Sequence, residues 1–92
     1  MIITFDKIPK ESRVWIYQSN RKFSEKEITE ITNKLKNFLE NWTAHGSDLL
    51  CSFTIKYNRF IIIALNEKSN KPTGCSIDSC VHFILGIQKH SL

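Results

Sequence analysis

The feature that most constrains the fold is one continuous apolar run, RFIIIAL, at residues 59–65. The run is rich in β-branched and aromatic side chains, and its length is typical of a strand. A strand without polar alternation is usually buried on both faces in the middle of a sheet. We therefore expect a central strand here, followed by a polar loop over residues 68–79.

A second apolar segment, VWIY at residues 14–17, also predicts a strand. Val14 and Ile16 would point to one face of the sheet, and Trp15 and Tyr17 to the other. Because both faces are apolar, we expect this strand to be covered on two sides or to lie inside the sheet.

Residues 24–42 carry the pattern of an amphipathic helix. Ser24 and Glu27 have the spacing of a capping box, in which each side chain satisfies a backbone N–H group of the other. An apolar stripe then recurs at helical spacing: Ile28, Ile31, Leu35, Phe38, Leu39 and Trp42. Gly46 is expected as a left-handed cap after this helix, with His45 near its negative end.

Two further elements complete the chain. Residues 49–58 alternate between apolar and polar side chains, which predicts a strand with one wet face, and Asn58 and Arg59 are expected to form a tight turn. A second helix is expected to begin near Ser76 or Asp78. Its inward stripe would comprise Ile77, Cys80, Val81, Ile84, Ile87 and Gln88.

The order strand, helix, strand, strand, helix predicts one α+β domain over residues 1–92. It matches the ferredoxin-like βαββαβ arrangement without its last strand, with an antiparallel or mixed sheet and both helices on one face. We expect the first and third strands to be central and parallel. The missing strand would leave the edge of residues 14–17 open, so we expect residues 2–5 or a second copy of the chain, in a homodimer, to cover it.

Charge and cysteine content narrow the function classes. The chain has 13 basic and 9 acidic residues, a small excess that argues against nucleic acid as a partner. Three cysteines do not form a disulfide framework, and the N-terminus shows neither a signal pattern nor an apolar stretch of membrane-spanning length. These features predict a cytoplasmic protein with reduced thiols and no membrane contact.

Several motifs together resemble one family of small uncharacterised bacterial proteins, many of which are labelled ABC transporter ATPases. The motifs are RVWIYQ (13–18), FLENW (38–42), the W-x-x-H-G pattern (42–46), YNRF (57–60) and GCSIDS (74–79). The resemblance covers residues 5–84, while residues 85–92 depart from the family pattern. It implies no reaction, because the function of the family is unknown.

An ATPase activity is excluded by the residues themselves. A phosphate-binding loop needs the pattern G-x-x-x-x-G-K-[ST], which wraps phosphates in backbone N–H groups. The three glycines, Gly46, Gly74 and Gly86, do not fit it. A chain of 92 residues is also too short for the doubly wound sheet of such ATPases.

The best candidate site is the segment that begins the second helix. A glycine loop at a helix start presents free N–H groups and a positive dipole end, which suit an anion. The candidate ligand residues are Gly74, Cys75, Ser76, Asp78 and Ser79. The alternative is purely structural: a turn at Gly74, a cap from Ser76 or Asp78, and Cys75 packed as a small apolar residue.

Cys75 is also the candidate for catalysis, because the same position favours a thiolate. A base would be needed from His45, His82 or His90, and the spacing places none of them beside Cys75. Cys75, Cys80 and His82 do not match a common zinc pattern, and no metal or cofactor is predicted. Trp42, Tyr57 and Phe60 are expected to be core residues.

We therefore expect a non-catalytic module that binds a small anion, a protein partner or a second copy of itself. The alternatives are a small thiol-dependent enzyme or redox-sensitive protein that uses Cys75, and a weak nucleic-acid binder.

Overall fold

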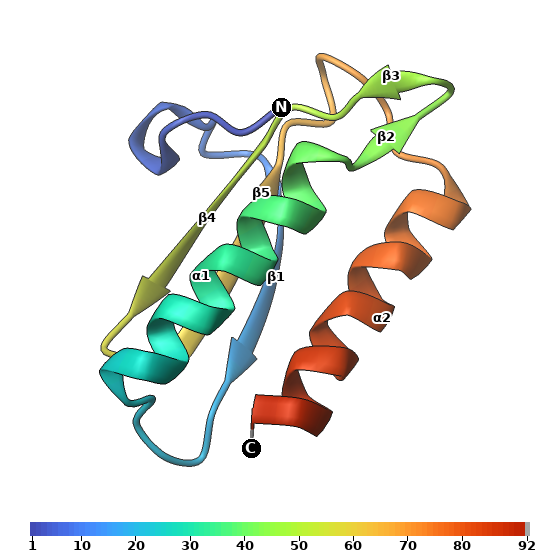
Figure 1. Ribbon diagram of the computed structural model, residues 1–92. Helices are drawn as coiled ribbons and strands as arrows, with labels where there is room; N and C mark the ends of the chain where they lie inside the picture. Colours follow the sequence, from blue (N-terminus) through green and yellow to red (C-terminus); the bar gives the residue numbers. More distant parts are fainter. Residues whose placement is uncertain (92) are drawn as a thin grey trace.

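The chain folds into a three-stranded sheet, a short separate hairpin and two long helices (Figure 1). The computed structural model describes the backbone of residues 1–91 and the side chains of residues 1–88. In chain order the elements are η1 (Phe5–Lys7), β1 (Arg13–Gln18), α1 (Glu25–Glu40), β2 (Thr43–Ala44), β3 (Ser47–Asp48), β4 (Cys51–Lys56), β5 (Phe60–Leu65) and α2 (Gly74–Ser91). The predicted α+β class is confirmed.

Strand β5 lies between β1 and β4, as the apolar run predicted, and it pairs antiparallel with both. The prediction that the first and third strands run parallel is wrong, because Val14 lies opposite Ala64 and Gln18 opposite Phe60 in antiparallel register. The tight connection between β4 and β5 makes these two strands antiparallel. Both β1 and β4 run against the strand between them, so they point in the same direction.

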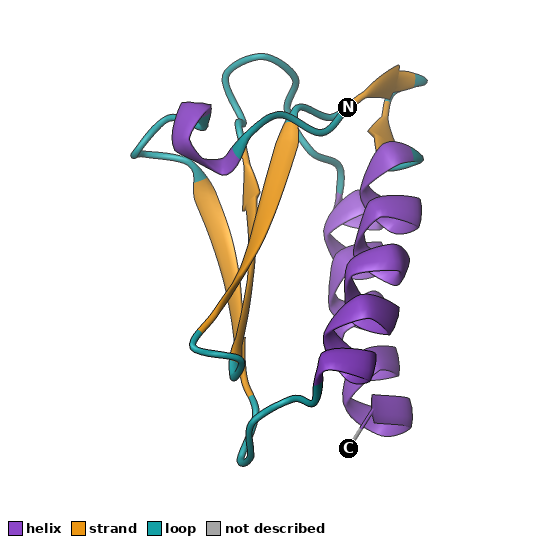
Figure 2. Ribbon diagram, turned by 60° about the vertical axis from the view of Figure 1, so that its left-hand side comes forward, coloured by secondary structure: helices purple, strands orange, loops and turns teal. Residues whose placement is uncertain are grey.

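Both α-helices cover the same face of the sheet, and the opposite face, here called the helix-free face, carries no α-helix and only the short η1 segment at one end (Figure 2). The core lies in this single layer between sheet and helices. Its fully buried large side chains include Ile31, Leu35, Leu39, Leu49, Ile61, Ile63 and Leu65.

The expectation that both faces of the sheet are buried is wrong. On the helix-free face, the side chains of Val14 and Ile16 are 50% and 62% exposed, and Ile62 is half-buried. The cause is the number of covering elements: two helices are enough for one side of three strands, and both lie on the side of Trp15, which packs against the core.

Helix α1 begins with the predicted capping box. The Ser24 hydroxyl accepts from the Glu27 N–H (3.2 Å), and the Glu27 carboxylate accepts from the Ser24 N–H (2.9 Å). Arg21 adds a bidentate contact to the same carboxylate at 2.8 and 2.6 Å, and these hydrogen bonds lower the pKa of Glu27 to about 2. The helix ends at Glu40, so Trp42 is a core residue outside the helix.

Positive φ values mark two turns, and both differ from prediction. His45 (φ 55°) and Gly46 (φ 74°) form the tip of the β2–β3 hairpin rather than a helix cap. Two successive residues with positive φ are what a two-residue hairpin requires. Between β4 and β5, Tyr57 (φ 55°) and Asn58 (φ 54°) take this conformation, and Arg59 does not.

The N-terminal segment lies along β4, not along β1 as one of the two expectations held. Ile2 forms a parallel bridge with Cys51, and the Ser52 hydroxyl donates to the Ile3 carbonyl at 2.7 Å. Within residues 1–91, no strand therefore pairs with the outer edge of β1.

Helix α2 begins at Gly74, earlier than predicted, because Thr73 provides the cap that the prediction missed. Its buried side chains include Cys80 and Ile87, as expected. Val81 and Gln88, which were assigned to the inward stripe, are exposed, and Phe83 takes part in the core in their place.

We expect the substitution Ile63→Ala to lower the free energy of unfolding by about 2–5 kcal/mol, because it leaves a cavity at the centre of the sheet. Ile63 is fully buried, whereas Ile16 in the neighbouring strand is mostly exposed. Ile16→Ala is thus the matched control and should cost less than about 1 kcal/mol. Urea unfolding of both variants at low protein concentration measures the difference, and equal losses would contradict the central place of β5.

Candidate functional site

A groove of about 510 Å³ opens beside the first turns of α2. It lies between the end of α1, the β2–β3 hairpin and the start of α2, which meet at one end of the molecule (Figure 1). The lining residues are Asn37, Phe38, Asn41, Trp42, Thr43, Ala44, His45, Thr73, Cys75, Ser76 and Ser79. Its volume falls in the range of small-molecule sites.

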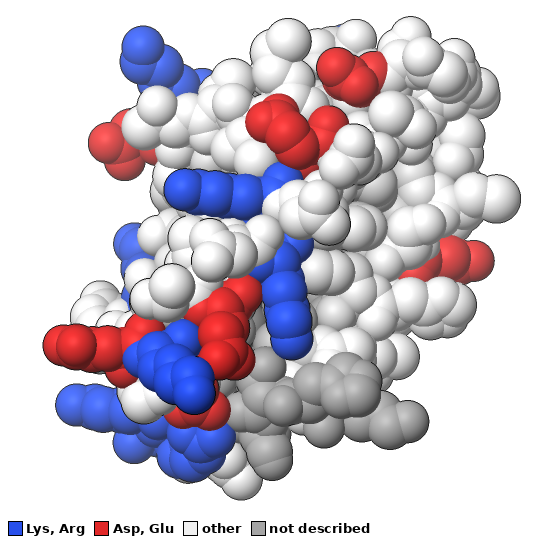
Figure 3. All heavy atoms as spheres, in the orientation of Figure 1, with Lys and Arg blue, Asp and Glu red and all other residues white. Residues whose placement is uncertain are grey.

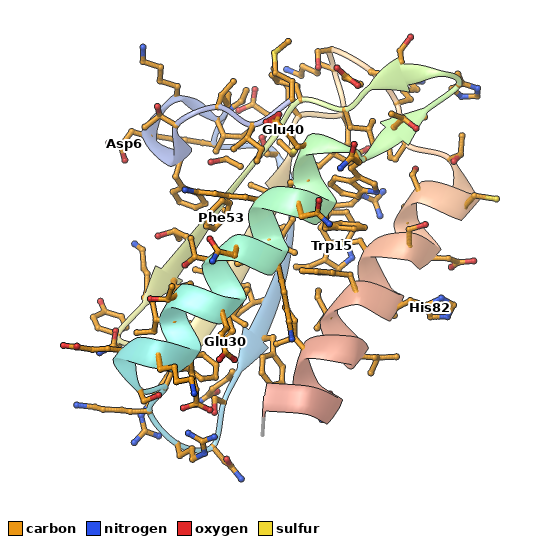
Figure 4. All side chains as sticks on the ribbon, in the orientation of Figure 1. Asp6, Trp15, Glu30, Glu40, Phe53 and His82 are labelled. Atoms are coloured by element: carbon orange, nitrogen blue, oxygen red, sulfur yellow. The ribbon has the colours of Figure 1, made fainter. Side chains whose placement is uncertain are left out.

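Trp42 joins the two helices beneath this groove. Its indole N–H donates to the Ser76 carbonyl at 2.8 Å, a buried bond between residues 34 positions apart. The ring also packs against Trp15 and Phe38, with centroids 5.7 and 5.4 Å apart. Figure 4 shows Trp15 between the sheet and the two helices. The start of α2 is thereby held in place by the hydrophobic core.

Asn70 fixes the hairpin side of the groove. Its side-chain amide nitrogen lies 3.3, 3.2 and 3.3 Å from the carbonyl oxygens of Ala44, Ser47 and Asp48. The polar loop before α2 is therefore attached to the hairpin. No periodicity in the sequence signals this contact, because its partners are backbone atoms.

The first turn of α2 is capped reciprocally. The Ser76 N–H donates to the Thr73 hydroxyl (3.0 Å), and the Thr73 N–H donates to the Ser76 hydroxyl (2.7 Å). The N–H groups of Gly74 and Cys75 have no hydrogen-bond partner within residues 1–91. Two free donors thus remain at the positive end of this helix.

The five predicted ligand residues divide into two sets. Cys75, Ser76 and Ser79 line the groove, and the Ser79 hydroxyl donates to the Cys75 carbonyl at 2.9 Å. Gly74 and Asp78 do not line it. His45 was named only as a candidate base, and the end of α1 was not assigned to the site, because only the fold brings these segments to the start of α2.

The three thiols differ sharply in environment, and all three are unpaired. Cys75 is exposed, contrary to the structural alternative in which it packs as an apolar residue. Burial raises the pKa of Cys51 to about 11 and that of Cys80 to about 12. Cys75 is thus the thiol available for reaction.

No base is placed on Cys75 by hydrogen bonding. His45 lines the same groove, but no hydrogen bond joins it to Cys75 in the described part of the chain. His82 projects from α2 away from the sheet (Figure 4), and the side chain of His90 lies outside the described residues. Nor does the described part contain a group of three His, Cys, Asp or Glu residues that could hold a metal ion.

The aromatic pair at the β4–β5 turn also differs from expectation. Tyr57, assigned to the core, is 78% exposed, and Phe60 is half-buried against it at 6.2 Å between ring centroids. Figure 3 shows basic and acidic side chains interspersed over α1 rather than a continuous basic stripe on this face. The exposed Tyr57 alone does not make a nucleic-acid surface.

Comparisons with known proteins found no relative of this chain: no family model matches it, and neither a curated protein nor a solved structure does. Within the described residues, neither helix has the length and apolar content needed to cross a membrane.

We expect iodoacetamide to modify Cys75 alone in the folded protein. At pH 8 a thiol with a pKa of about 11 is ionised to only about 0.1%, and burial also blocks access to Cys51 and Cys80. Mass spectrometry should show one adduct in buffer, three in denaturant, and none in buffer for Cys75→Ser. Rapid modification of a second thiol in the folded protein would contradict the buried positions of the other two.

Proposed function

We propose that this protein is a non-catalytic binding module that associates with a second copy of itself through β1. One observation carries the proposal: the outer edge of β1 has no strand beside it within the described residues, and its side chains Val14 and Ile16 are exposed. Soluble proteins usually protect such an edge with lysine, proline or a bulge. Residues 14–18 contain none of these.

The hydrogen-bond pattern identifies the groups available for pairing. The Ser19 N–H donates to the Arg59 carbonyl at 2.7 Å, which continues the ladder between β1 and β5. Because antiparallel strands alternate in direction, Tyr17 and Trp15 turn their backbone groups to β5 as well. The N–H and C=O groups of Val14, Ile16 and Gln18 then point outward, away from the sheet.

These three residues define one self-complementary register. With a twofold axis at Ile16, each Ile16 lies opposite its counterpart, and Val14 lies opposite Gln18 of the second copy. All outward N–H and C=O groups then find partners. The stretch from Val14 to Gln18 carries no charge, so no like charges meet across the axis. The exposed apolar side chains of both copies would form one patch.

The size of this contact predicts a weak dimer. A six-residue strand is about 20 Å long and a sheet about 10 Å thick, so the edge buries on the order of a few hundred Å² per copy. Specific stable interfaces bury about 800 Å² per partner. We therefore propose an association that depends on protein concentration in the micromolar to millimolar range.

The topology supports an added strand at the same place. The order β1–β5–β4, with two helices on one face, leaves the place next to β1 without a strand in the described residues. A second copy would supply that neighbour. Three unpaired cysteines fit the proposed cytoplasmic location, where thiols stay reduced.

We expect Ile16→Lys to weaken dimerisation at least about tenfold, because it places two like charges opposite each other at the axis. Ile16→Glu should have the same effect, and an equimolar mixture of the two variants should restore the dimer. Val81→Lys is the control, since Val81 is an exposed apolar residue on α2. Sedimentation velocity over about 10 µM to 1 mM protein measures association.

Two results would overturn this assignment. The wild-type protein would remain monomeric throughout the concentration range, or it would dimerise as strongly with lysine at residue 16 as without it. If a mixture of the lysine and glutamate variants does not dimerise, the twofold axis does not lie at Ile16.

A second candidate function is favoured by the groove at the start of α2, which combines a defined volume with the free N–H group of Cys75 in its lining and that of Gly74 next to it in the chain. We propose that it takes a small anion. The thiol-dependent alternative uses the same groove, and rapid alkylation of Cys75 below neutral pH would support it. Slow alkylation there would exclude a catalytic thiolate.

We expect inorganic phosphate to shift the amide NMR signals of Gly74 and Cys75. Asp78→Asn should tighten binding about two- to fivefold, because it removes a negative charge from the first turns of α2. Glu30→Gln on α1 is the matched control and should leave the affinity unchanged. Shifts that are absent, or that do not respond to Asp78→Asn, would contradict an anion site at this helix.

A further inference from the structure

A second groove, of about 330 Å³, lies on the helix-free face of the sheet. Its wall comes from η1 and the segment after it, with Phe5, Ile8 and Pro9, and its floor from the cross-strand pair Val14 and Ala64. Figure 2 shows η1 on the side of the sheet opposite the helices. This groove is therefore separate from the one beside α2.

The wall of this groove is fixed by backbone hydrogen bonds. The Lys7 N–H donates to the Thr4 carbonyl at 2.9 Å, and the Ile8 N–H to the Phe5 carbonyl at 3.2 Å. The segment before it is tied to β4 through the Ile3 N–H, which donates to the Cys51 carbonyl at 2.9 Å. The groove is thus preformed, as ligand sites usually are.

Ser12 lines this groove and has an unusual hydroxyl group. Its oxygen is buried, and it is the one buried side-chain polar atom without a hydrogen-bond partner in the described part of the chain. Buried hydroxyl groups are nearly always hydrogen-bonded, since an unsatisfied one destabilises the fold. The position therefore calls for a partner that the described residues do not provide.

Two opposite charges, Asp6 and Lys10, complete the lining. Neither forms an ion pair within the described residues, and Asp6 projects outward from η1 (Figure 4). Most of the remaining lining is apolar. A ligand that matches these groups has an apolar body and one polar head group.

We propose that the groove binds a small amphiphilic molecule, with its alkyl or aryl body against Phe5, Ile8 and Val14 and an oxygen-containing head group hydrogen-bonded to Ser12. Medium-chain alcohols and medium-chain carboxylates share this chemistry. A carboxylate would in addition interact with the ammonium group of Lys10.

The proposal is tested by titrating the protein with octanol and with octanoate while its amide NMR signals are followed. Shifts should cluster on residues 5–14 and on Ala64. Ser12→Ala should weaken binding of both compounds about two- to tenfold, the effect of one hydrogen bond. Ser47→Ala, on the exposed hairpin, is the matched control. Lys10→Gln should weaken the binding of octanoate and leave the binding of octanol unchanged, because only octanoate carries a carboxylate.

Three results would overturn the site. The first is that the NMR shifts do not cluster on residues 5–14 and Ala64. The second is that Ser12→Ala binds both compounds as tightly as the wild type, which would mean that the hydroxyl bonds only to water. The third concerns the protein without ligand: Ser12→Ala should keep or raise the melting temperature, and a marked fall would show that the hydroxyl already has a partner. Because Ser12 precedes β1, this variant should dimerise normally, which separates this test from that of self-association.

Discussion

The structure depends on one constraint: three strands have two faces, and two helices cover only one of them. As a result, the apolar side chains of β5 fall into two sets, one on each face of the sheet. Ile61, Ile63 and Leu65 turn toward the helices and are buried, whereas Ile62 is half-buried on the other side. The hydrophobic core lies in a single layer, and both proposed contact regions of the sheet lie outside it.

The two helices are coupled most directly through Trp42. The residue lies just beyond α1, yet its indole N–H reaches the backbone of α2. Phe38 and Phe83 stack at 4.5 Å between ring centroids and join the same helices further along. The groove beside α2 is thus bounded by a rigid joint on one side and by a hairpin attached through Asn70 on the other. A ligand bound there would contact two segments that the core and the polar loop already hold.

Much of the fold could be predicted because local signals agreed with the tertiary structure. The Ser24–Glu27 capping box and the apolar run of β5 depend on residues close in sequence, and both were identified correctly. The exposure of the helix-free face could not be predicted, because the pattern of apolar residues along a strand does not reveal whether one or both faces of the sheet are covered. The exposed Ile16 is the result.

The candidate site was predictable only in part, for a related reason. Cys75, Ser76 and Ser79 belong to one local segment, and the structure places them on one groove. His45 reaches the same groove through a hairpin turn that the sequence pattern had suggested as a helix cap. The sequence around His45 does not indicate which distant segment the hairpin turn will face.

The strand pairing also has a consequence for the order of folding. β4 and β5 meet across a turn of a few residues, while Gln18 and Phe60 of β1 and β5 are 42 positions apart (60 − 18). Closing so long a loop costs more entropy than closing a hairpin. The β4–β5 hairpin therefore has a kinetic advantage, and β1 completes the sheet late. During synthesis β1 leaves the ribosome before β5, the strand with which it pairs in the described residues.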